Sequence, residues 1–216
     1  TQLGIDRDVT DCGLECNSFT ARPWMYEERL HPTNWVTDRS IDFLRRRDRS
    51  MPFFLMASYL RPHPPFDAPE AFFDLYRHRE LTPPAIGDWA DRERLQRLGR
   101  LTDADTGSVD PELMRQARIG YYACISHLDN QIGRLLDALK DDGRYQDTVI
   151  LFTSDHGELL GDHYTFRKLF YENSAQIFDP LPALRIPYGI VELLGVGVQA
   201  EILLPSGFHE PAVFIM

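Results

Sequence analysis

The chain has 216 residues, of which 43% are hydrophobic, and its net charge at pH 7 is −10. This length and apolar content suit one substantial domain with a buried core and exclude a disordered chain. The negative charge argues against nucleic acid as a partner, because phosphate binding needs a basic surface, but a local cationic cluster could still bind a small anion. The sequence contains no run of 18 apolar residues, which a membrane-spanning helix would need, so no membrane partner is expected. The oligomeric state stays open.

The cysteine pattern does not describe a disulfide framework. Cys12, Cys16 and Cys124 are odd in number and show no repeated spacing. Cys12 and Cys16 could pair or bind a metal, but no second ligand pair lies nearby. We expect three reduced thiols, which favours a reducing compartment such as the cytoplasm. The chain starts at Thr1 without a signal-peptide pattern, as expected for a piece of a longer protein, so a signal peptide upstream stays open.

Two elements are predicted in the first sixty residues. A helix is expected to begin with Thr33 or Asn34 as its N-cap and to end at the three arginines of residues 45–47. The near-continuous apolar run at residues 52–60 then predicts a strand that is buried on both faces, as in a parallel sheet.

A proline-rich stretch follows this strand. Four prolines in residues 61–70 exclude both a helix and a strand ladder, and they predict a rigid loop. A short helix is expected to start at Pro69. Residues 80–108 are polar and rich in turn residues, so they are predicted to form a surface excursion.

The strongest helix signal in the chain begins with Asp110 as the N-cap and Pro111 at the first helical position. Gly143 is expected to end this helix, and Gly120 is expected to interrupt its first part. The predicted apolar stripe has spacings of three and four residues and consists of Tyr121, Ile125, Leu128, Ile132, Leu135 and Leu139.

The apolar run at residues 148–155 predicts a second buried strand. Strand, loop, helix, helix and strand in this order predict an α/β fold with a mostly parallel central sheet flanked by helices. Residues 1–176 are assigned to one such domain, present here in part. From residue 177 the pattern changes, because residues 177–216 contain one basic residue, Arg185, of the 23 in the chain.

Two predicted strands end in chemically reactive side chains. Arg61 and His63 follow the first strand, and Asp155 and His156 follow the second. Gly157 then permits a tight turn of the backbone. Ligands bind beyond the carboxyl ends of strands in open α/β sheets, so these residues are candidates for a site. Asp155 and His156 supply an oxygen and a nitrogen ligand to a divalent metal, although two ligands do not complete a site.

Structural roles are the alternative for each of these residues. An Asp-His pair at a strand end also serves as a helix cap, Lys168 could be a solvated surface lysine, and His63 could be a loop histidine. Asp162 and His163 could form the polar face of a turn. Structural roles are also expected for the remaining histidines, His31, His78, His127 and His209.

The segment TSDHGELLGDHYTFRKLFYENSAQI resembles the C-terminal metal-and-lysine motif of the sulfatases, within the alkaline phosphatase superfamily. Three earlier segments resemble, in the same order, those that precede this motif in the family: HPTNWVTDRSIDFLRRR, PFFLMASYLRPHPPFDAPEAFFDLY and ARIGYYACISHLDNQIGRLLDAL. The resemblance covers roughly residues 30–177 and points to bacterial arylsulfatases and phosphonate monoester hydrolases. It implies an alkaline-phosphatase-like fold, incomplete here at both ends, and a small anionic ester as the substrate.

The resemblance assigns roles position by position. It implies that Asp155 and His156 bind a divalent metal, with calcium favoured and manganese or magnesium as alternatives. It implies that Lys168, twelve residues after His156, contacts the sulfate group, and that His63 contacts the ester and helps the leaving oxygen. The family's nucleophile is a formylglycine whose hydrate attacks sulfur, while the metal, the lysine and the histidine neutralise charge on the sulfuryl oxygens.

The chain departs from this family pattern at the nucleophile. None of its cysteines or serines begins the C/S-x-P/A-x-R motif from which formylglycine is made, and the first pair of acidic metal ligands lies upstream in the family. The chain is therefore expected to be a fragment of a sulfuric ester hydrolase with negligible turnover of its own. The alternatives are a phosphonate or phosphate ester hydrolase and a non-catalytic module that binds anions through His63, Lys168 and Arg61.

The tail is the second departure. After ENSAQI the family continues with a proline, an apolar strand and a D-x-x-P-T segment, and residues 177–216 do not follow this pattern. We hypothesise that a reading-frame shift near residue 177 produced this divergent tail. Translation of the DNA in the other frames tests the hypothesis, because the absence of a family-like continuation there would show that it is wrong.

Overall fold

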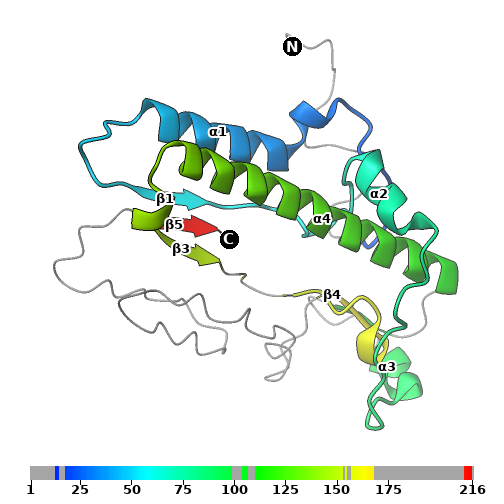
Figure 1. Cartoon of the computed structure of the whole chain (residues 1–216). Coiled ribbons are helices and arrows are strands. Elements are labelled where there is room, and N and C mark those ends of the chain that lie inside the picture. The colour runs from blue at the N-terminus through cyan, green and yellow to red at the C-terminus, as the bar shows by residue number, and fades with distance from the viewer. Residues whose placement is uncertain are drawn as a thin grey trace.

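A computed structural model describes residues 13–14, 18–98, 104–106, 110–152, 154, 157–167 and 212–215 of the protein. Helices dominate this part of the chain, and the strands are short (Figure 1). In chain order the elements are η1 (Glu28–Leu30), α1 (Pro32–Arg46), β1 (Phe54–Ala57), α2 (Glu70–Arg77), α3 (Arg92–Leu98), β2 (Ala104–Thr106), α4 (Pro111–Asp141), η2 (Tyr145–Asp147), β3 (Val149–Phe152), η3 (Asp162–Tyr164), β4 (Thr165–Arg167) and β5 (Ala212–Ile215). None of the helices described combines the length and apolar character needed to cross a membrane.

The described strands form two sheets. β5 lies between β1 and β3 and pairs in parallel with both, so that Val213 is opposite Leu55 on one side and Ile150 on the other. β2 and β4 form a separate antiparallel pair. α1 and α4 lie side by side over one face of the three-stranded sheet (Figure 1). This arrangement agrees with the predicted α/β class, while a larger central sheet stays a prediction.

The first predicted strand and loop lie where the sequence placed them, but the predicted burial of the strand on both faces is wrong, because Phe54 and Met56 are 58% and 55% exposed. β1 occupies four residues of the apolar run 52–60, and the proline-rich residues 61–69 form the loop between β1 and α2. α2 begins at Glu70, directly after Pro69. The excursion predicted at residues 80–108 is more ordered than expected, because it contains α3 and β2.

The first helix begins earlier than predicted. Its N-cap is His31, whose Nδ1 accepts a hydrogen bond from the Thr33 amide at 3.1 Å. The prediction of Thr33 or Asn34 as the N-cap is therefore wrong. Pro32 explains the difference, because its fixed φ angle suits the first helical position and its missing amide leaves no donor to satisfy.

An apolar cluster joins α1, β1 and the C-terminal half of α4. Its buried residues are Ile41, Leu44, Ala57, Tyr59, Leu135 and Leu139. The hydroxyls of Thr37 and Tyr59 lie 2.9 Å apart within this interface, which satisfies the one polar atom that the tyrosine carries into it. Packing of two helices on one strand therefore supplies the core of this part of the fold.

Both predicted ends of α4 are confirmed. Asp110 caps the helix, since its carboxylate accepts hydrogen bonds from the amides of Glu112 at 2.9 Å and Leu113 at 3.0 Å. At the other end, Gly143 has a φ of 73° and follows the last helical turn. This left-handed conformation is accessible to glycine without a steric penalty, so the helix stops there.

The predicted interruption at Gly120 is wrong, because α4 runs through it without a break. The residue serves packing instead. A Cβ at Gly120 would lie 2.5 Å from the Cβ of Ala21 and 2.7 Å from the Cβ of Phe66. The glycine therefore lets two other segments approach the helix closely.

The predicted apolar stripe of α4 is correct only in its second half. Leu135 and Leu139 are buried, whereas Ile125 is exposed. Before Leu135 most of the buried side chains are small or polar, with Ile119 as the large apolar exception, and they include Ala117, Ala123, Cys124, His127 and Gln131. Small side chains there leave room for the loops that pack on this part of the helix.

Gly120→Ala tests the close approach to α4. The added methyl group overlaps Phe66 and Ala21, so we expect the free energy of unfolding to fall by about 1–3 kcal/mol, although alanine favours a helix by up to ~1 kcal/mol. Gly133→Ala is the matched control, since no atom lies within 4 Å of its Cβ position, and it should be stabilising. Urea unfolding followed by circular dichroism measures both variants, and equal stability of the two would contradict the close contact.

Candidate active site

His63 lies in the loop between β1 and α2 and is half-buried. Its amide donates to the carbonyl of Leu60 at 3.0 Å, and its Nδ1 lies 2.9 Å from the carbonyl oxygen of Pro64. A carbonyl oxygen only accepts, so Nδ1 carries a proton. In the neutral ring Nε2 is then the nitrogen whose lone pair accepts hydrogen bonds.

A buried ion pair closes the loop around His63. Arg61 Nε lies 2.5 Å from Asp67 Oδ1, and Nη2 lies 2.7 Å from Oδ2, with 4% and 0% of the two side chains exposed. A third nitrogen, Nη1, donates to the carbonyl of His63 at 3.4 Å. Because Asp67 holds this guanidinium inside the protein, the prediction that Arg61 belongs to an anion pocket is wrong.

Asp67 stays charged although it is fully buried. Burial alone raises its pKa, but the neighbouring His31 ring and the Arg61 guanidinium lower the pKa of Asp67 well below its usual range. His31 Nε2 lies 3.5 Å from Asp67 Oδ1, while Nδ1 accepts from the amide of Thr33. The proton is therefore on Nε2, and His31 connects the first turn of α1 to the loop that carries His63.

A second buried histidine supports the same region. His127 Nε2 donates to Asn34 Oδ1 at 2.7 Å, and its ring packs edge-on against His31 with centroids 4.6 Å apart. Burial lowers the pKa of His127 to about 3, and the neighbouring His31 contributes to this shift. A histidine that stays neutral at pH 7 and is held between two helices has a structural role, as expected.

The turn that precedes β4 has an unusual backbone. Gly161 has a φ of 93°, and positive φ angles between 47° and 63° occur at Leu160, His163 and Tyr164; Arg167, at the end of β4, has a φ of 64°. Left-handed conformations of non-glycine residues cost of order 1–3 kcal/mol each and persist only where the surroundings hold them. Here the amide of Gly161 donates to the Thr165 carbonyl at 2.8 Å, and that of Leu159 donates to the Arg167 carbonyl at 3.2 Å.

Asp162 and His163 have a role that the sequence did not reveal, because they bind the segment before α3. The amide of Ala85 donates to Asp162 Oδ1 at 2.9 Å, and the amide of His163 donates to the Ala85 carbonyl at 2.8 Å. The amide of Gly87 donates to His163 Nδ1 at 3.0 Å. The turn therefore fixes residues 85–87 next to the start of β4.

One apolar cluster, called here the shared cluster, joins the two candidate segments. It consists of Phe66, Ala68, Phe73, Ala117, Ile119, Ala123, Cys124, Leu160 and Phe166. Phe66 belongs to the loop of His63, and Phe166 belongs to β4, two residues before Lys168. Both segments therefore pack against the N-terminal half of α4.

Three predicted site residues, Asp155, His156 and Lys168, lie outside the described residues. Their predicted roles rest on their places in the chain: the Asp-His pair follows β3, and Lys168 comes directly after Arg167 of β4. In the part of the chain that the structure describes, no three His, Cys, Asp or Glu side chains are grouped to hold a metal ion. The metal ligands therefore stay a prediction.

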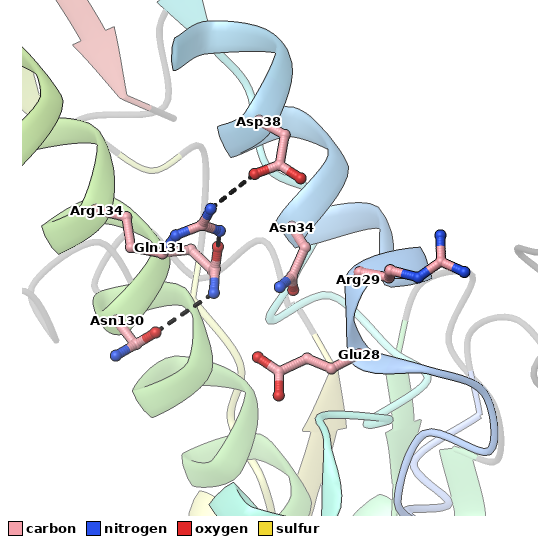
Figure 2. A pocket seen from close by; sticks show the side chains of 7 residues that line it. All are labelled: Glu28, Arg29, Asn34, Asp38, Asn130, Gln131 and Arg134. Atoms are coloured by element: carbon pink, nitrogen blue, oxygen red, sulfur yellow. Dashed lines mark hydrogen bonds and ion pairs between the residues drawn. The ribbon is translucent and has the colours of Figure 1, made fainter. Parts of the chain in front are cut away.

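A polar groove of about 320 Å³ lies between α1 and α4 (Figure 2), and it contains none of the predicted site residues. It is lined by Glu28, Arg29, Asn34, Asp38, Asn130, Gln131 and Arg134. Several of these side chains bind one another. Arg134 Nη2 donates to Asp38 Oδ1 at 2.8 Å, and Nη1 donates to Gln131 Oε1 at 2.5 Å. The groove therefore links the two helices through its own polar groups.

Comparisons with known proteins identify the family. The sulfatase family model matches residues 10–188. The chain is 48% identical over 182 residues to an arylsulfatase of Clostridium perfringens, an alignment that covers 82% of this chain and 38% of the relative. It is 33% identical over 166 residues to the multifunctional alkaline phosphatase superfamily protein PehA of Trinickia caryophylli. This alignment covers 70% of this chain and 32% of PehA. The chain belongs to the sulfatase family, so the resemblance seen in the sequence is confirmed.

A solved structure supports the fold. The phosphonate monoester hydrolase of Agrobacterium radiobacter matches with a TM-score of 0.61 and 29% identity, over 75% of this chain and 34% of that one. This similarity confirms an α/β fold like that of the alkaline phosphatase superfamily. The chain thus spans about a third of the length of the relatives that it matches, 38% of the arylsulfatase and 32% of PehA.

Asp67→Asn tests the ion pair that closes the loop. The substitution removes the counter-charge beside the buried Arg61 guanidinium, so the free energy of unfolding should fall by about 3–5 kcal/mol at pH 7. Folding lowers the pKa of Asp67, so its contribution is fully present above the ordinary value of 3.8 and is lost as the pH falls through the folded-state value. The difference between variant and wild type should therefore shrink in acid.

Asp74→Asn is the control for this change, because Asp74 pairs with Arg77 on the exposed surface of α2. It should cost about 0–1 kcal/mol. Urea unfolding at several pH values measures both variants. A loss at Asp67 no larger than the loss at Asp74 would show that the pair does not support the loop.

Proposed function

We propose that this chain carries part of the active site of a metal-dependent sulfuric ester hydrolase that acts on small anionic esters. Membership of the sulfatase family supports this proposal. The observation that carries it is the shared cluster, in which the loop of His63 and the strand that leads to Lys168 pack against the same helix. A histidine and a lysine whose flanking segments share one core are suited to act on one small anion.

In this proposal His63 and Lys168 divide the work on the ester. Lys168 places an ammonium group against the sulfuryl oxygens, where charge develops in the transition state. In this proposal His63 acts as the imidazolium, gives its Nε2 proton to the leaving oxygen and becomes neutral, while Nδ1 keeps its proton in the hydrogen bond to the Pro64 carbonyl. Arg61 and Asp67 hold the backbone of the histidine and do not touch the ester.

We propose that Asp155 and His156 hold the divalent metal, with calcium favoured over manganese and magnesium. A carboxylate oxygen and an imidazole nitrogen fit such a cation chemically, but they leave most of its coordination positions to other ligands. When bound, the metal supplies positive charge to the sulfuryl oxygens.

Asp155→Asn tests the metal assignment through binding. Calorimetric titration with calcium chloride should show an affinity about tenfold lower for the variant, because an amide oxygen carries no net charge. Asp147→Asn, at the exposed end of η2, should leave the affinity unchanged. Equal affinities for the wild type and Asp155→Asn would show that Asp155 is not a ligand.

The proposed active site also needs a nucleophile, and none of the four proposed site residues supplies it. No C/S-x-P/A-x-R motif occurs among the 216 residues. We therefore propose that this chain binds the anionic group but does not turn it over. Hydrolysis of phosphonate or phosphate esters is a second candidate function, favoured by the similarity to a phosphonate monoester hydrolase. Anion binding without catalysis, through His63 and Lys168, is a third.

Sulfate binding and ester hydrolysis separate these functions. Calorimetry should detect saturable sulfate binding by the wild-type chain, weakened about tenfold or more in Lys168→Ala, since the ammonium group is the proposed partner. Lys140→Ala, at an exposed lysine paired with Asp137, is the matched control and should bind sulfate as the wild type does.

The chain should not release 4-nitrophenol from 4-nitrophenyl sulfate or from a 4-nitrophenyl phosphonate. Turnover that Lys168→Ala abolishes would overturn the proposal that the chain lacks a nucleophile. Sulfate binding that is equal in Lys168→Ala and Lys140→Ala would instead remove Lys168 from the site.

A further inference from the structure

The seven described side chains that line the polar groove between α1 and α4 are all polar or charged (Figure 2). The most buried of them are Asn34 of α1 and Gln131 of α4, which are 6% and 1% exposed. Glu28 and Asn130 also line the groove and are exposed. With a volume of about 320 Å³ the groove is within the range of small-molecule pockets, ~300–1,000 Å³. Its lining selects for a polar ligand.

Asn34 presents a hydrogen-bond donor to this groove in a fixed orientation. His127 Nε2 donates to Asn34 Oδ1 at 2.7 Å, so the other polar atom of the amide, Nδ2, is left for the groove (Figure 2). Among the described residues Nδ2 has no hydrogen-bond partner. The amide cannot rotate without losing its bond to the buried histidine, so this donor is preorganised.

Glu28 supplies the matching acceptor. It belongs to η1, and Figure 2 shows its carboxylate directed toward the groove. The adjacent Arg29 pairs with Glu27 at 2.6 Å, and Arg134 pairs with Asp38 at 2.8 Å. Within the described part of the chain neither arginine neutralises Glu28, and its carboxylate has no ion-pair or hydrogen-bond partner.

A ligand of this groove has to accept a hydrogen bond from Asn34 and donate one to Glu28. An ammonium ion has no acceptor, and an anion is repelled by Glu28 and Asp38. Hydroxyl groups donate and accept, and adjacent hydroxyls on one ring can give two parallel hydrogen bonds to a carboxylate. A peptide bond also donates and accepts, but apolar side chains of a peptide would find no apolar partner among the seven lining side chains.

We propose that the groove binds a neutral polyhydroxy ligand, a pyranose sugar or its glycoside, through Asn34 Nδ2 and the carboxylate of Glu28. The other hydroxyls of the ring face Asn130, Gln131 and Arg134, which bind one another and so set the shape of the groove. Each hydrogen bond to the sugar replaces one to water, so we expect a dissociation constant of about 1 mM. None of the four residues proposed to act on an ester lines the groove.

NMR of the full chain with ¹⁵N-labelled asparagine tests the contact. The chain contains four asparagines, and the side-chain signal that is lost in Asn34→Asp is that of Asn34. The methyl glycosides of glucose, galactose and mannose are titrated separately, and at least one should shift this signal saturably. Tetrahydropyran-2-methanol, a similar ring with one hydroxyl, should leave the signal in place. N-methylacetamide, which represents the peptide bond, should also leave it in place.

Variants of the two glutamates of this segment complete the experiment. Glu28→Ala should weaken the binding of the glycoside about tenfold or more, because a hydrogen bond to a charged acceptor is lost. Glu27→Ala is the matched control, since this neighbouring side chain is 68% exposed and does not line the groove, and it should bind as the wild type does. Both replaced side chains are exposed, so both variants should keep the circular dichroism spectrum of the wild type.

Four results would overturn the proposal. Absence of a saturable shift with all three glycosides at up to about 100 mM would mean that the groove holds only water. Equal binding by Glu28→Ala and Glu27→Ala would remove Glu28 from the site. An equal shift with N-methylacetamide would assign the groove to a peptide, and an equal shift with tetrahydropyran-2-methanol would mean non-specific binding. None of these results depends on sulfate, so the proposed function stands or fails separately.

Discussion

The buried ion pair between Arg61 and Asp67 is the interaction on which this half of the site depends. Four prolines remove amide donors from the loop, and the main-chain hydrogen bonds that it makes to residues 20–24 involve only its second half, at Phe66 and Ala68. The two charged side chains join the first half of the loop to this second half, and His31 connects them to α1. Buried ion pairs seldom add net stability, because desolvation offsets their attraction. We therefore attribute to this pair a single loop conformation for His63 rather than extra stability.

The second constraint is the composition of α4. Its C-terminal half packs through leucines, as amphipathic helices usually do, whereas its N-terminal half presents alanine, glycine and cysteine to its neighbours. These small side chains let the loop of His63 and the turn before Lys168 reach the same helix. The burial of Cys124 raises its pKa to about 12, so this thiol is protonated at neutral pH and serves the packing.

Local signals in the sequence predicted the local structure well. Asp110, Gly143 and the prolines of residues 61–70 act on the backbone next to them, and their effects are where the sequence placed them. The prediction for Gly120 was wrong because its role depends on Phe66, 54 positions earlier in the chain. Helix propensity describes only local backbone preference, so it does not reveal such a contact. The His31 cap was missed because histidine is not among the usual capping residues, and Pro32 shifted the start of the helix.

The candidate site was predictable in part. Family motifs and the pattern of reactive residues at strand ends predicted His63, Asp155, His156 and Lys168, and of these the structure describes His63. The support of the site was not visible, since Asp67 bonds across a loop and Asp162 bonds to a segment 77 residues away. These hydrogen-bond partners become neighbours only in the folded chain, so local sequence patterns do not reveal them. A weak signal did exist, because an aspartate in the apolar sequence PFDAP needs a buried cation or donor.

The position of β5 has a consequence for the order of folding during synthesis. Phe54 of β1 pairs with Ala212, and β3 meets β1 only through β5 among the described strands. A ribosome needs several seconds to add the residues between β3 and β5 at about 5–20 residues per second. α1, α4 and their leucine-rich interface are complete by then. The helical pair is thus free to collapse onto β1 early, and the three-stranded sheet closes only after β5 has emerged.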